Sequence, residues 1–437
     1  MPELRRDLGF VGMAAVAASM MLGTGIFFGP SLTAQEFPST GMVLLLWTIG
    51  GIVALCGAWV FGRLAALHPF AGGPYVYVRE AYGPWAAFLF AWTSFVIIAP
   101  SSMAVMASLF ARHVAEVSPL SRAGLVLMTL WSLAATTFAN AIGVKTGGRV
   151  QSLLTGLKIV LVSALIALLV GATGSDDAEP VTGGGRLSIA FVGILFAVGG
   201  WEYAVLASEE VRDPRKTIPR ALLTGTAIVV ALYLLVVLAY LLMLGADGVA
   251  RSTALAPEAA ERALAGTGRW VGLAVGISAL GTLNAIVLLG PRATFAVARD
   301  GLLPPALARV SKRFGTPIVA ILLQGLLTIV YYLTGAFATV AAYTVIGTGL
   351  FIILSAVVLP RLRKQAGLER RPIHRLEDLA AWLVAGVYAW FFVFLIIEDP
   401  ATAAIGFGLI AFGIVPYLIL RRLGFRPRQP RVQSANL

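Results

Sequence analysis

Charged residues are scarce in this chain. Lys, Arg, Asp and Glu make up 12% of its 437 residues, whereas 59% are hydrophobic, and the mean hydropathy is +0.88. A soluble protein needs roughly 25% charged residues to cover its surface. The shortage of charge therefore excludes a soluble globular protein and indicates a polytopic membrane protein.

Residues that build disulfides, metal centres and hydrolytic sites are also few. The single cysteine, Cys56, cannot form a disulfide within the chain, and its apolar surroundings are typical of a small core residue. The three histidines, His68, His113 and His374, lack metal-ligand spacing. No phosphate-binding glycine loop and no Ser/His/Asp or His-Glu-x-x-His set is present. We expect no cofactor, no metal, no ATP-driven pump and no enzyme.

Long apolar runs account for most of the chain. We predict about 12 membrane-spanning helices, because ~20 apolar residues cross a bilayer. The first run is too long for the core of a cleavable signal peptide. The runs cover approximately 8–35, 41–67, 82–111, 122–143, 150–171, 187–208, 220–245, 269–298, 317–334, 337–360, 379–397 and 401–421. The connection after the seventh run contains residues 257–263, whose sequence fits a short surface helix.

The basic residues are distributed unequally between the two sides of this layout. With the N-terminus inside, 26 of the 33 Lys and Arg residues lie at inner loops and helix ends and six at outer ones, with Lys158 left inside a span. The positive-inside rule then favours an even number of spans and two cytoplasmic termini, in a multi-pass protein of the cell membrane. The same distribution explains the net charge of +12 without a nucleic acid partner. The basic tail, residues 421–431, is expected to meet anionic lipid head groups.

Two apolar runs carry glycines where a continuous helix would cross the membrane. Gly23-Thr24-Gly25 interrupts the first run, and Gly199-Gly200 interrupts the sixth. Glycine weakens a helix by ~1 kcal/mol relative to alanine. Backbone groups freed inside a membrane must face protein, water or a bound molecule. Paired interruptions at corresponding places in two halves indicate the binding site of a secondary transporter.

Five motifs stand in order along the apolar runs. They are Gly23 to Pro30, Pro69 to Tyr77 with Ala81 to Pro84, Asn140 to Lys145 with Lys158, Phe196 to Trp201 with Glu209 to Ala221, and Asn284 with Ala298 to Pro304. Together they resemble the amino acid–polyamine–organocation (APC) superfamily of transporters. The Gly-Gly-Trp form of the sixth run is most similar to prokaryotic relatives of its L-type, neutral amino acid branch. The resemblance covers residues 8 to 360, and the last third of the chain fits the pattern less well.

The resemblance implies an all-α membrane fold of two inverted five-helix repeats followed by two extra helices. Residues 1–172 would form the first repeat, with its first helix broken, and residues 187–360 the second repeat, with the sixth helix broken. Residues 361–437 would form spans 11 and 12 and the basic tail.

An α-amino acid presents a carboxylate and an ammonium, and a broken helix offers partners for both. The N–H groups of Thr24, Gly25 and Ile26 would bind the carboxylate. By resemblance, the carbonyls of Met21, Phe196, Ala197 and Gly199 would face the ammonium, next to Gly23 and Gly200. The other interpretation is that these glycines only allow close helix packing, although Gly23-x-Gly25 has the wrong spacing for that motif.

Aromatic and polar residues near the breaks have alternative roles. Phe196 and Trp201 are either ordinary packing residues or part of the pocket; the resemblance makes Phe196 a gate on the outer side and makes Trp201 a limit on pocket volume. Asn284 in the eighth run either bonds across helices or lines the site. Tyr75, on the cytoplasmic loop, is expected to belong to an inner gate.

Two ionisable residues lie within the predicted spans, Lys158 and Glu202. Such residues are costly in a membrane and mark functional sites. Lys158 either extends toward the interface or, as the resemblance implies, occupies the place of a coupling cation between spans 1 and 8 and links transport to protonation. Glu202 is a protonation or gating site, a partner for a cationic substrate, or a structural hydrogen-bond acceptor.

The predicted function is secondary active transport of L-amino acids, neutral ones first, by alternating access and with coupling to protons or exchange. The alternative is a cationic amino acid or polyamine exchanger that uses Glu202 and the acidic loop at 176–179. A channel or a membrane-embedded enzyme is disfavoured, because the spans lack pore-lining polar repeats and catalytic pairs. The sequence carries no signal of oligomeric state.

Overall fold

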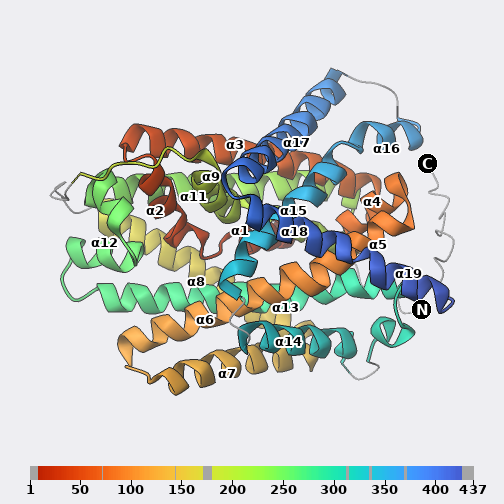
Figure 1. The fold of residues 1–437 in the computed structure, drawn as a ribbon, viewed down its shortest axis with the longest axis horizontal. Helices are drawn as coiled ribbons and strands as arrows, with labels where there is room; N and C mark the ends of the chain where they lie inside the picture. Colours follow the sequence, from red (N-terminus) through yellow and green to blue (C-terminus); the bar gives the residue numbers. More distant parts are fainter. Residues whose placement is uncertain are drawn as a thin grey trace.

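A computed structural model gives the fold, and in the part of the chain that it describes the regular structure is helical (Figure 1). The helices lie mostly along one direction, as expected of a bundle that crosses a membrane. The described residues are 8–70, 72–142, 144–170, 180–311, 314–333, 337–368 and 372–425. The acidic loop at 176–179 and the end of the basic tail lie outside these ranges.

The first half of the bundle begins with an interrupted segment, α1 to α2, which longer helices follow. Its elements are α1 (Phe10–Met21), η1 (Gly25–Phe27), α2 (Gly29–Glu36), α3 (Thr40–Leu67), α4 (Pro74–Tyr82), α5 (Pro84–Trp92), η2 (Thr93–Ile98), α6 (Ala99–Val117), α7 (Arg122–Ala141) and α8 (Val144–Val170).

The second half begins with another interrupted segment. Its elements are α9 (Leu187–Val198), α10 (Trp201–Ala204), η3 (Val205–Glu210), α11 (Pro214–Arg251), α12 (Leu255–Ala263), α13 (Gly268–Arg299), η4 (Pro305–Ala308), α14 (Ile318–Leu333), α15 (Phe337–Ala356), α16 (Leu359–Gln365), α17 (Pro372–Glu398), α18 (Pro400–Phe412) and α19 (Ile414–Arg422).

Nine helical segments of the described chain are long and apolar enough to cross a membrane, and the bent pair α15–α16 gives a tenth. The two other predicted spans correspond to shorter apolar helices, α1 and α14. The predicted surface helix at 257–263 is present as α12. Several boundaries differ from prediction because polar residues extend helices beyond the apolar runs, as in α11, which begins at Pro214 rather than near residue 220.

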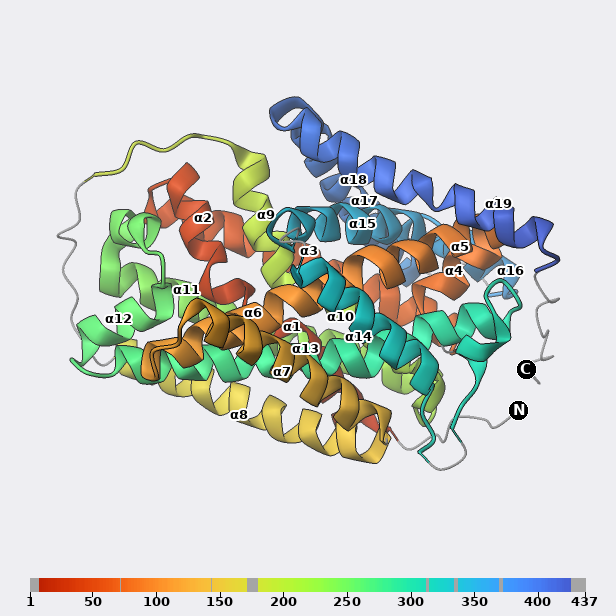
Figure 2. The same ribbon diagram turned by 60° about the horizontal axis from the view of Figure 1, so that its bottom comes forward.

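Two long helices organise the interior. α11 packs along α3 and α1, while α13 packs along α6 and α8. Figure 2 shows α18 and α19 along one edge of the bundle and α8 along the opposite edge. The interrupted segments lie together beside α11, because α1 and α10 pack against each other and both contact α11.

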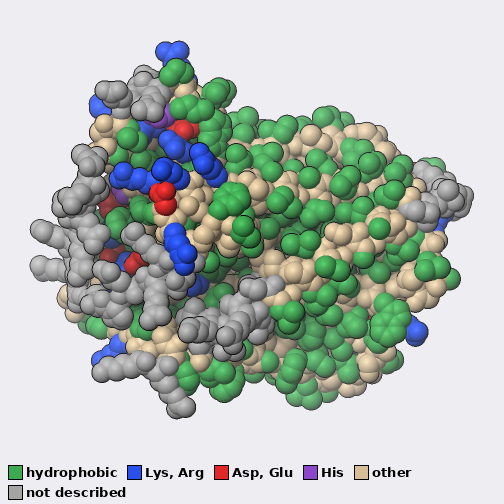
Figure 3. Space-filling view, turned by 180° about the vertical axis from the view of Figure 1, so that it is seen from behind, with side chains coloured by type: hydrophobic (Ala, Val, Ile, Leu, Met, Phe, Trp, Pro, Cys, Tyr) green, Lys and Arg blue, Asp and Glu red, His purple; other side chains and the backbone are tan. Residues whose placement is uncertain are grey.

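The outer surface of the bundle is apolar over its middle. Leu127, Phe138, Leu153 and Leu242 are more than half exposed, as lipid-facing residues are. Figure 3 shows hydrophobic side chains covering the middle of one face, with Lys and Arg gathered toward one end. Together with the long apolar helices, this surface identifies a multi-pass membrane protein.

Candidate functional site

The two glycine-bearing segments meet backbone to backbone in the middle of the molecule. α1 ends at Met21, and helical geometry resumes at Gly25; α9 ends at Val198, and α10 begins at Trp201. A Cβ atom on Gly25 would lie 2.5 Å from the Cα of Ala197. Gly200 has a φ of +106°, and a Cβ there would lie 2.5 Å from the carbonyl oxygen of Met20. Glycine is therefore needed both for the turn and for the approach of the two segments.

A side chain of a neighbouring helix forms hydrogen bonds with backbone groups that the first interruption frees. The Tyr233 hydroxyl on α11 donates to the carbonyl of Met21 at 2.7 Å and accepts from the N–H of Gly23 at 3.2 Å. In the described part of the chain, no hydrogen bond uses the N–H groups of Thr24 and Gly25. These two donors stay available to a ligand, whereas the Met21 carbonyl, predicted to face an ammonium, already has a hydroxyl partner.

A cavity of about 120 Å³ lies against both interruptions. Eight of the predicted site residues line it: Met21, Gly23, Thr24, Gly25, Phe196, Gly199, Gly200 and Glu202. The remaining wall comes from α6, α13, α15 and α17, with Ser102, Met106, Thr282, Ile286, Thr344, Thr348 and Tyr388 among its residues. These wall residues were not predicted from the sequence. A sequence signal for them does exist, namely polar or apolar pairs spaced i, i+4, such as Ser102 with Met106 and Thr344 with Thr348, which share a helix face.

Phe196 lies at the cavity and contacts a second aromatic ring. Its ring centroid is 5.5 Å from that of Phe28, and the two planes are tilted by 48°. Phe28 directly precedes α2, so the ring pair links the segment after the first interruption to the end of α9. This arrangement brings an aromatic side chain to the wall for which a gate is predicted.

Glu202 is buried, with 7% of its surface exposed, and it lines the cavity. Its Oε2 atom accepts a hydrogen bond from the N–H of Gly200 at 2.9 Å. The carboxyl group therefore fixes the second interruption from within the same turn. This contact corresponds to the structural role among the alternatives.

Lys158 is fully buried on α8 and bridges two elements of the site. Its Nζ atom donates to the carbonyl of Leu22 and to the Oγ1 of Thr282, both at 2.7 Å. A Cβ on Gly281 would lie 2.6 Å from the Lys158 Cε, so a glycine on α13 makes room for the side chain. The ammonium thus sits between the end of α1 and the middle of α13, and Thr282 separates it from the cavity.

Four predicted site residues lie beside the cavity rather than on its wall. The Trp201 ring points toward α3, where its centroid is 5.0 Å from that of Phe61, and Gly57 gives it space. Asn284 accepts a hydrogen bond from Asn140 at 2.8 Å, across α7 and α13. Ile26 and Ala197 pack in the core beside the interruptions. Their rotation about each helix explains these positions, since neighbouring residues on a helix face different directions.

Tyr75 lies away from the cavity, within a polar cluster at the end of the bundle. Its hydroxyl donates to Asp300 at 2.7 Å, and Arg79 pairs with the same carboxylate. Burial, and then the charge of Asp300, raise the pKa of Tyr75, so its hydroxyl stays protonated. Arg292 of α13 also pairs with Glu210 of η3 at 2.7 Å. These contacts join α4 and η3 to α13 where an inner gate is predicted.

The residues that line the cavity have the chemistry of a small-molecule site. Among the described residues, no three His, Cys, Asp or Glu side chains gather as metal ligands. Backbone donors, hydroxyl groups, a thioether and aromatic rings line the space. Such a mixture suits a ligand with a compact polar end and a less polar remainder.

Comparison with known proteins identifies the family. The family model described as "Amino acid permease" matches residues 8–419. The human cystine/glutamate transporter is 27% identical over an alignment of 456 positions that covers 100% of this chain and 89% of that protein. The human b(0,+)-type amino acid transporter 1 is 29% identical, covering 85% of this chain and 79% of the relative.

A third relative extends the same result. The mouse Asc-type amino acid transporter 1 is 28% identical, covering 94% of this chain and 80% of the relative. The matched family and these relatives are transporters and not enzymes. With its multi-pass apolar helices, the chain therefore belongs to the amino acid permease family of the APC superfamily.

Proposed function

We propose that the protein is a secondary transporter that carries neutral L-amino acids across the cell membrane by alternating access. It would have 12 spans: the nine long segments, the pair α15–α16, α14, and α1 joined to α2. Spans 1–5 (residues 1–172) and 6–10 (187–360) would form the inverted repeats, spans 11 and 12 would follow in residues 361–437, and both termini would be cytoplasmic.

The observation that carries this proposal is the cavity at the two interruptions. The N–H groups of Thr24 and Gly25 have no partner among the described hydrogen bonds, and both residues line the cavity. The N–H groups at a helix start carry partial positive charge. A carboxylate is the natural occupant of such a site. The ammonium would lie at the carbonyl end of α9, at Phe196, Ala197 and Gly199.

The rest of the cavity supports a neutral side chain. Ser102 contributes a hydroxyl group, the Thr344 hydroxyl is shared with Ser101 at 2.8 Å, and Met106 and Ile286 offer apolar surface. No Lys or Arg is among the described lining residues, and the one carboxylate is held by Gly200. The volume of about 120 Å³ favours a short side chain.

Proton coupling through Lys158 and Glu202 is the second part of the proposal. The Lys158 ammonium contacts a carbonyl at the end of α1 and a hydroxyl on α13, which are also the groups that hold a small cation. Protonation of Lys158 would stabilise the interrupted segment in one state of the cycle, and Glu202 would exchange its proton at the cavity.

The second candidate function is exchange of cationic amino acids or polyamines. It is favoured by one observation, namely that the Glu202 carboxyl group lines the cavity. If its hydrogen bond to Gly200 were given up, the carboxylate would be free to pair with a cationic side chain. The charge of the preferred substrate therefore distinguishes neutral amino acid transport from exchange of cationic substrates.

The test is uptake of labelled alanine, leucine, arginine and putrescine into proteoliposomes that contain the full-length protein. We expect alanine uptake to rise with an inward proton gradient and to collapse with an uncoupler. Uptake only into preloaded vesicles would contradict proton coupling and indicate obligate exchange. Movement of arginine or putrescine alone would favour the second candidate, and movement of no amino acid would refute the proposal.

The variant that tests the contact between the interruptions is Gly25→Val, and Gly41→Val is its control. The larger side chain at position 25 would overlap the Ala197 backbone and open the contact between the interruptions. Gly41→Val provides the matched exposed position, where a Cβ meets nothing within 4 Å. We expect uptake to be lost in the first variant and retained in the second.

A further inference from the structure

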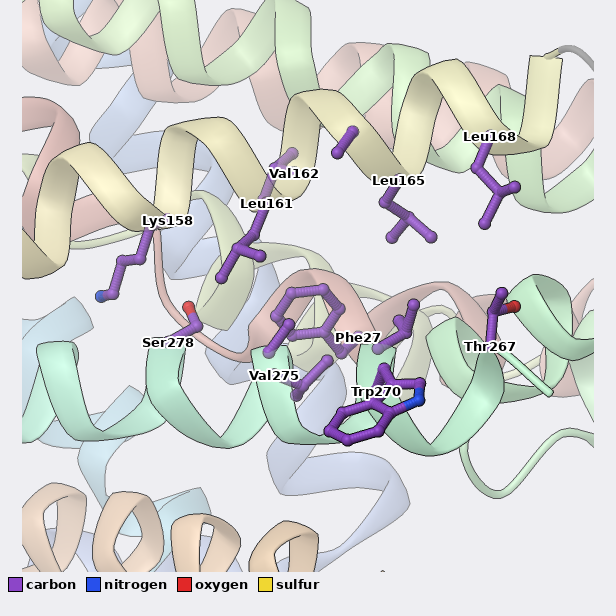
Figure 4. Close-up of a pocket in the computed structure, with 13 residues that line it drawn as sticks. Phe27, Lys158, Leu161, Val162, Leu165, Leu168, Thr267, Trp270, Val275 and Ser278 are labelled. Atoms are coloured by element: carbon purple, nitrogen blue, oxygen red, sulfur yellow. The ribbon is translucent and has the colours of Figure 1, made fainter. Parts of the chain in front are cut away.

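A second, larger cavity lies between α8 and α13 and is not used by the transport cycle proposed above. We propose that this crevice binds one acyl chain of a membrane phospholipid, with the lipid phosphate held at Arg269. The crevice has a volume of about 270 Å³. Figure 4 shows its side chains pointing into the space between the two helices.

The wall of the crevice is almost entirely apolar. Leucine, valine, alanine and aromatic side chains make up most of it, and Lys158, Thr267 and Ser278 are its polar members. The Lys158 ammonium is already held by a carbonyl and a hydroxyl group, so it offers no open site to a polar ligand. An apolar space of this kind holds water poorly and suits a hydrocarbon chain.

The length of the crevice matches one leaflet of a bilayer. On α8 the lining residues run from Lys158 to Leu168, which spans ~15 Å at the helical rise of ~1.5 Å per residue. The hydrocarbon core of a bilayer is ~30 Å thick, so one acyl chain reaches across about half of it. The crevice runs from Lys158, near the middle of α8, to Thr267 and Trp270 at the start of α13 (Figure 4). In a bilayer we expect the first end at mid-membrane depth and the second at the interface.

One side of the crevice is continuous with the lipid-facing surface. Ala164 on α8 is exposed, and Trp270 on α13 is 55% exposed while also lining the space. Neighbouring residues of α8, such as Val160 at 62% exposure, face the surrounding bilayer. A lipid chain therefore reaches the crevice sideways from the membrane without crossing a polar region.

The mouth of the crevice carries a group that complements a phosphate. The Arg269 guanidinium is exposed and lies 5.3 Å from the centre of the Trp270 ring. The neighbouring Glu261 carboxylate interacts with the charge of Arg269, and its two oxygens already accept hydrogen bonds from the backbone N–H groups of Gly266 and Gly268, at 2.7 and 2.8 Å. Arginine binds phosphate through charge-assisted hydrogen bonds, and tryptophan favours the head-group level.

A bound chain would touch the substrate-binding half of the molecule. Phe27 of η1 lines the crevice, and Lys158 at its inner end holds the carbonyl of Leu22. An acyl chain between α8 and α13 would keep these helices apart and support Phe27 from behind. Lipid occupancy would then bias the geometry of the first interruption.

The experiment is photocrosslinking of the full-length protein in liposomes. The probe is a phosphatidylglycerol whose acyl chain carries a terminal diazirine, and peptide mass spectrometry locates the labels. The variant Ala164→Phe fills the crevice from its exposed edge. Ala167→Phe is the matched control, because Ala167 is also exposed on α8 but does not line the crevice.

We expect crevice residues of α8 and α13 to be labelled in the unaltered protein and in Ala167→Phe, and the label there to be lost in Ala164→Phe. Ala274→Phe, on the opposite wall, should lose it too. Arg269→Gln should lower the labelling at limiting probe by about fivefold, the effect of one basic residue near a membrane surface. Label confined to outward residues such as Val160, or unchanged label in both filling variants, would overturn the proposal. The readout is binding, so it does not depend on whether the protein transports amino acids.

Discussion

The Tyr233 hydroxyl provides a sharp test of how the first interruption is held. It donates to the carbonyl of Met21 and accepts from the N–H of Gly23, so one side chain satisfies two backbone groups that left the helix. Replacing it by phenylalanine removes both hydrogen bonds while keeping the ring. Tyr233 is 1% exposed, so water does not easily substitute for the lost hydroxyl.

The size of the effect follows from the two hydrogen bonds that are lost, since the Gly23 N–H and the Met21 carbonyl keep their own contact at 2.6 Å. A typical hydrogen bond contributes ~0.5–1.5 kcal/mol to stability. Two of them together are worth ~2 kcal/mol, which corresponds to a factor of about 30 in an equilibrium constant. We expect Tyr233→Phe to weaken substrate binding by about this factor, or to lower the unfolding temperature if the whole bundle is affected.

Tyr240→Phe is the matched control on the same helix. Tyr240 is fully buried on α11, and its hydroxyl has no hydrogen-bond partner within the described residues. Removing this hydroxyl should leave binding unchanged and the protein as stable or more so. For both variants we would measure substrate affinity by a scintillation proximity assay and the unfolding temperature in detergent. Equal behaviour of the two variants would refute the role assigned to Tyr233.

Three further predictions concern charged groups. Lys158→Met should abolish the stimulation of uptake by a proton gradient, and uptake that still follows the gradient would exclude Lys158 from coupling. Glu202→Gln keeps an acceptor for the Gly200 N–H but cannot ionise, so alanine should still bind while the pH dependence of uptake flattens; an unchanged pH profile would contradict this. Glu377 is 2% exposed and pairs with Arg363 at 2.9 Å and with Arg63 at 2.8 Å. Glu377→Ala removes both pairs but leaves Arg363 paired with Asp378 at 3.0 Å, so we expect a loss of ~1.5–3 kcal/mol in unfolding free energy, with exposed Arg375→Ala as control.

The positions of the two interruptions could be predicted because their cause is local. Glycine at Gly25 and Gly200 allows backbone geometry that other residues resist, and this property is visible in sequence. The direction of side chains around each helix is set by packing, which the sequence does not show. Trp201 thus packs on α3 although it follows the second interruption directly, and Asn284 meets Asn140 instead of the cavity.

The surroundings of Lys158 were predictable only in outline. Its depth in an apolar run indicated a functional site, and the resemblance implied a place between spans 1 and 8, but the carbonyl of Leu22 was not predicted as its partner. Thr282 was not foreseen, because a threonine in an apolar helix satisfies its hydroxyl within its own helix in most cases, as Thr282 also does with Ser278. The α8–α13 crevice depends on the distance between two helices, which no local pattern encodes.

The contact between Gly25 and Ala197, and that between Gly200 and Met20, leave no side chain between the two interruptions. Flexible side chains between moving segments absorb displacement, since rotamers change at little cost. Here bare backbones touch, so a shift of about one ångström in either segment must be followed by the other. The two interruptions are therefore expected to move together, and a ligand that displaces one of them displaces the other.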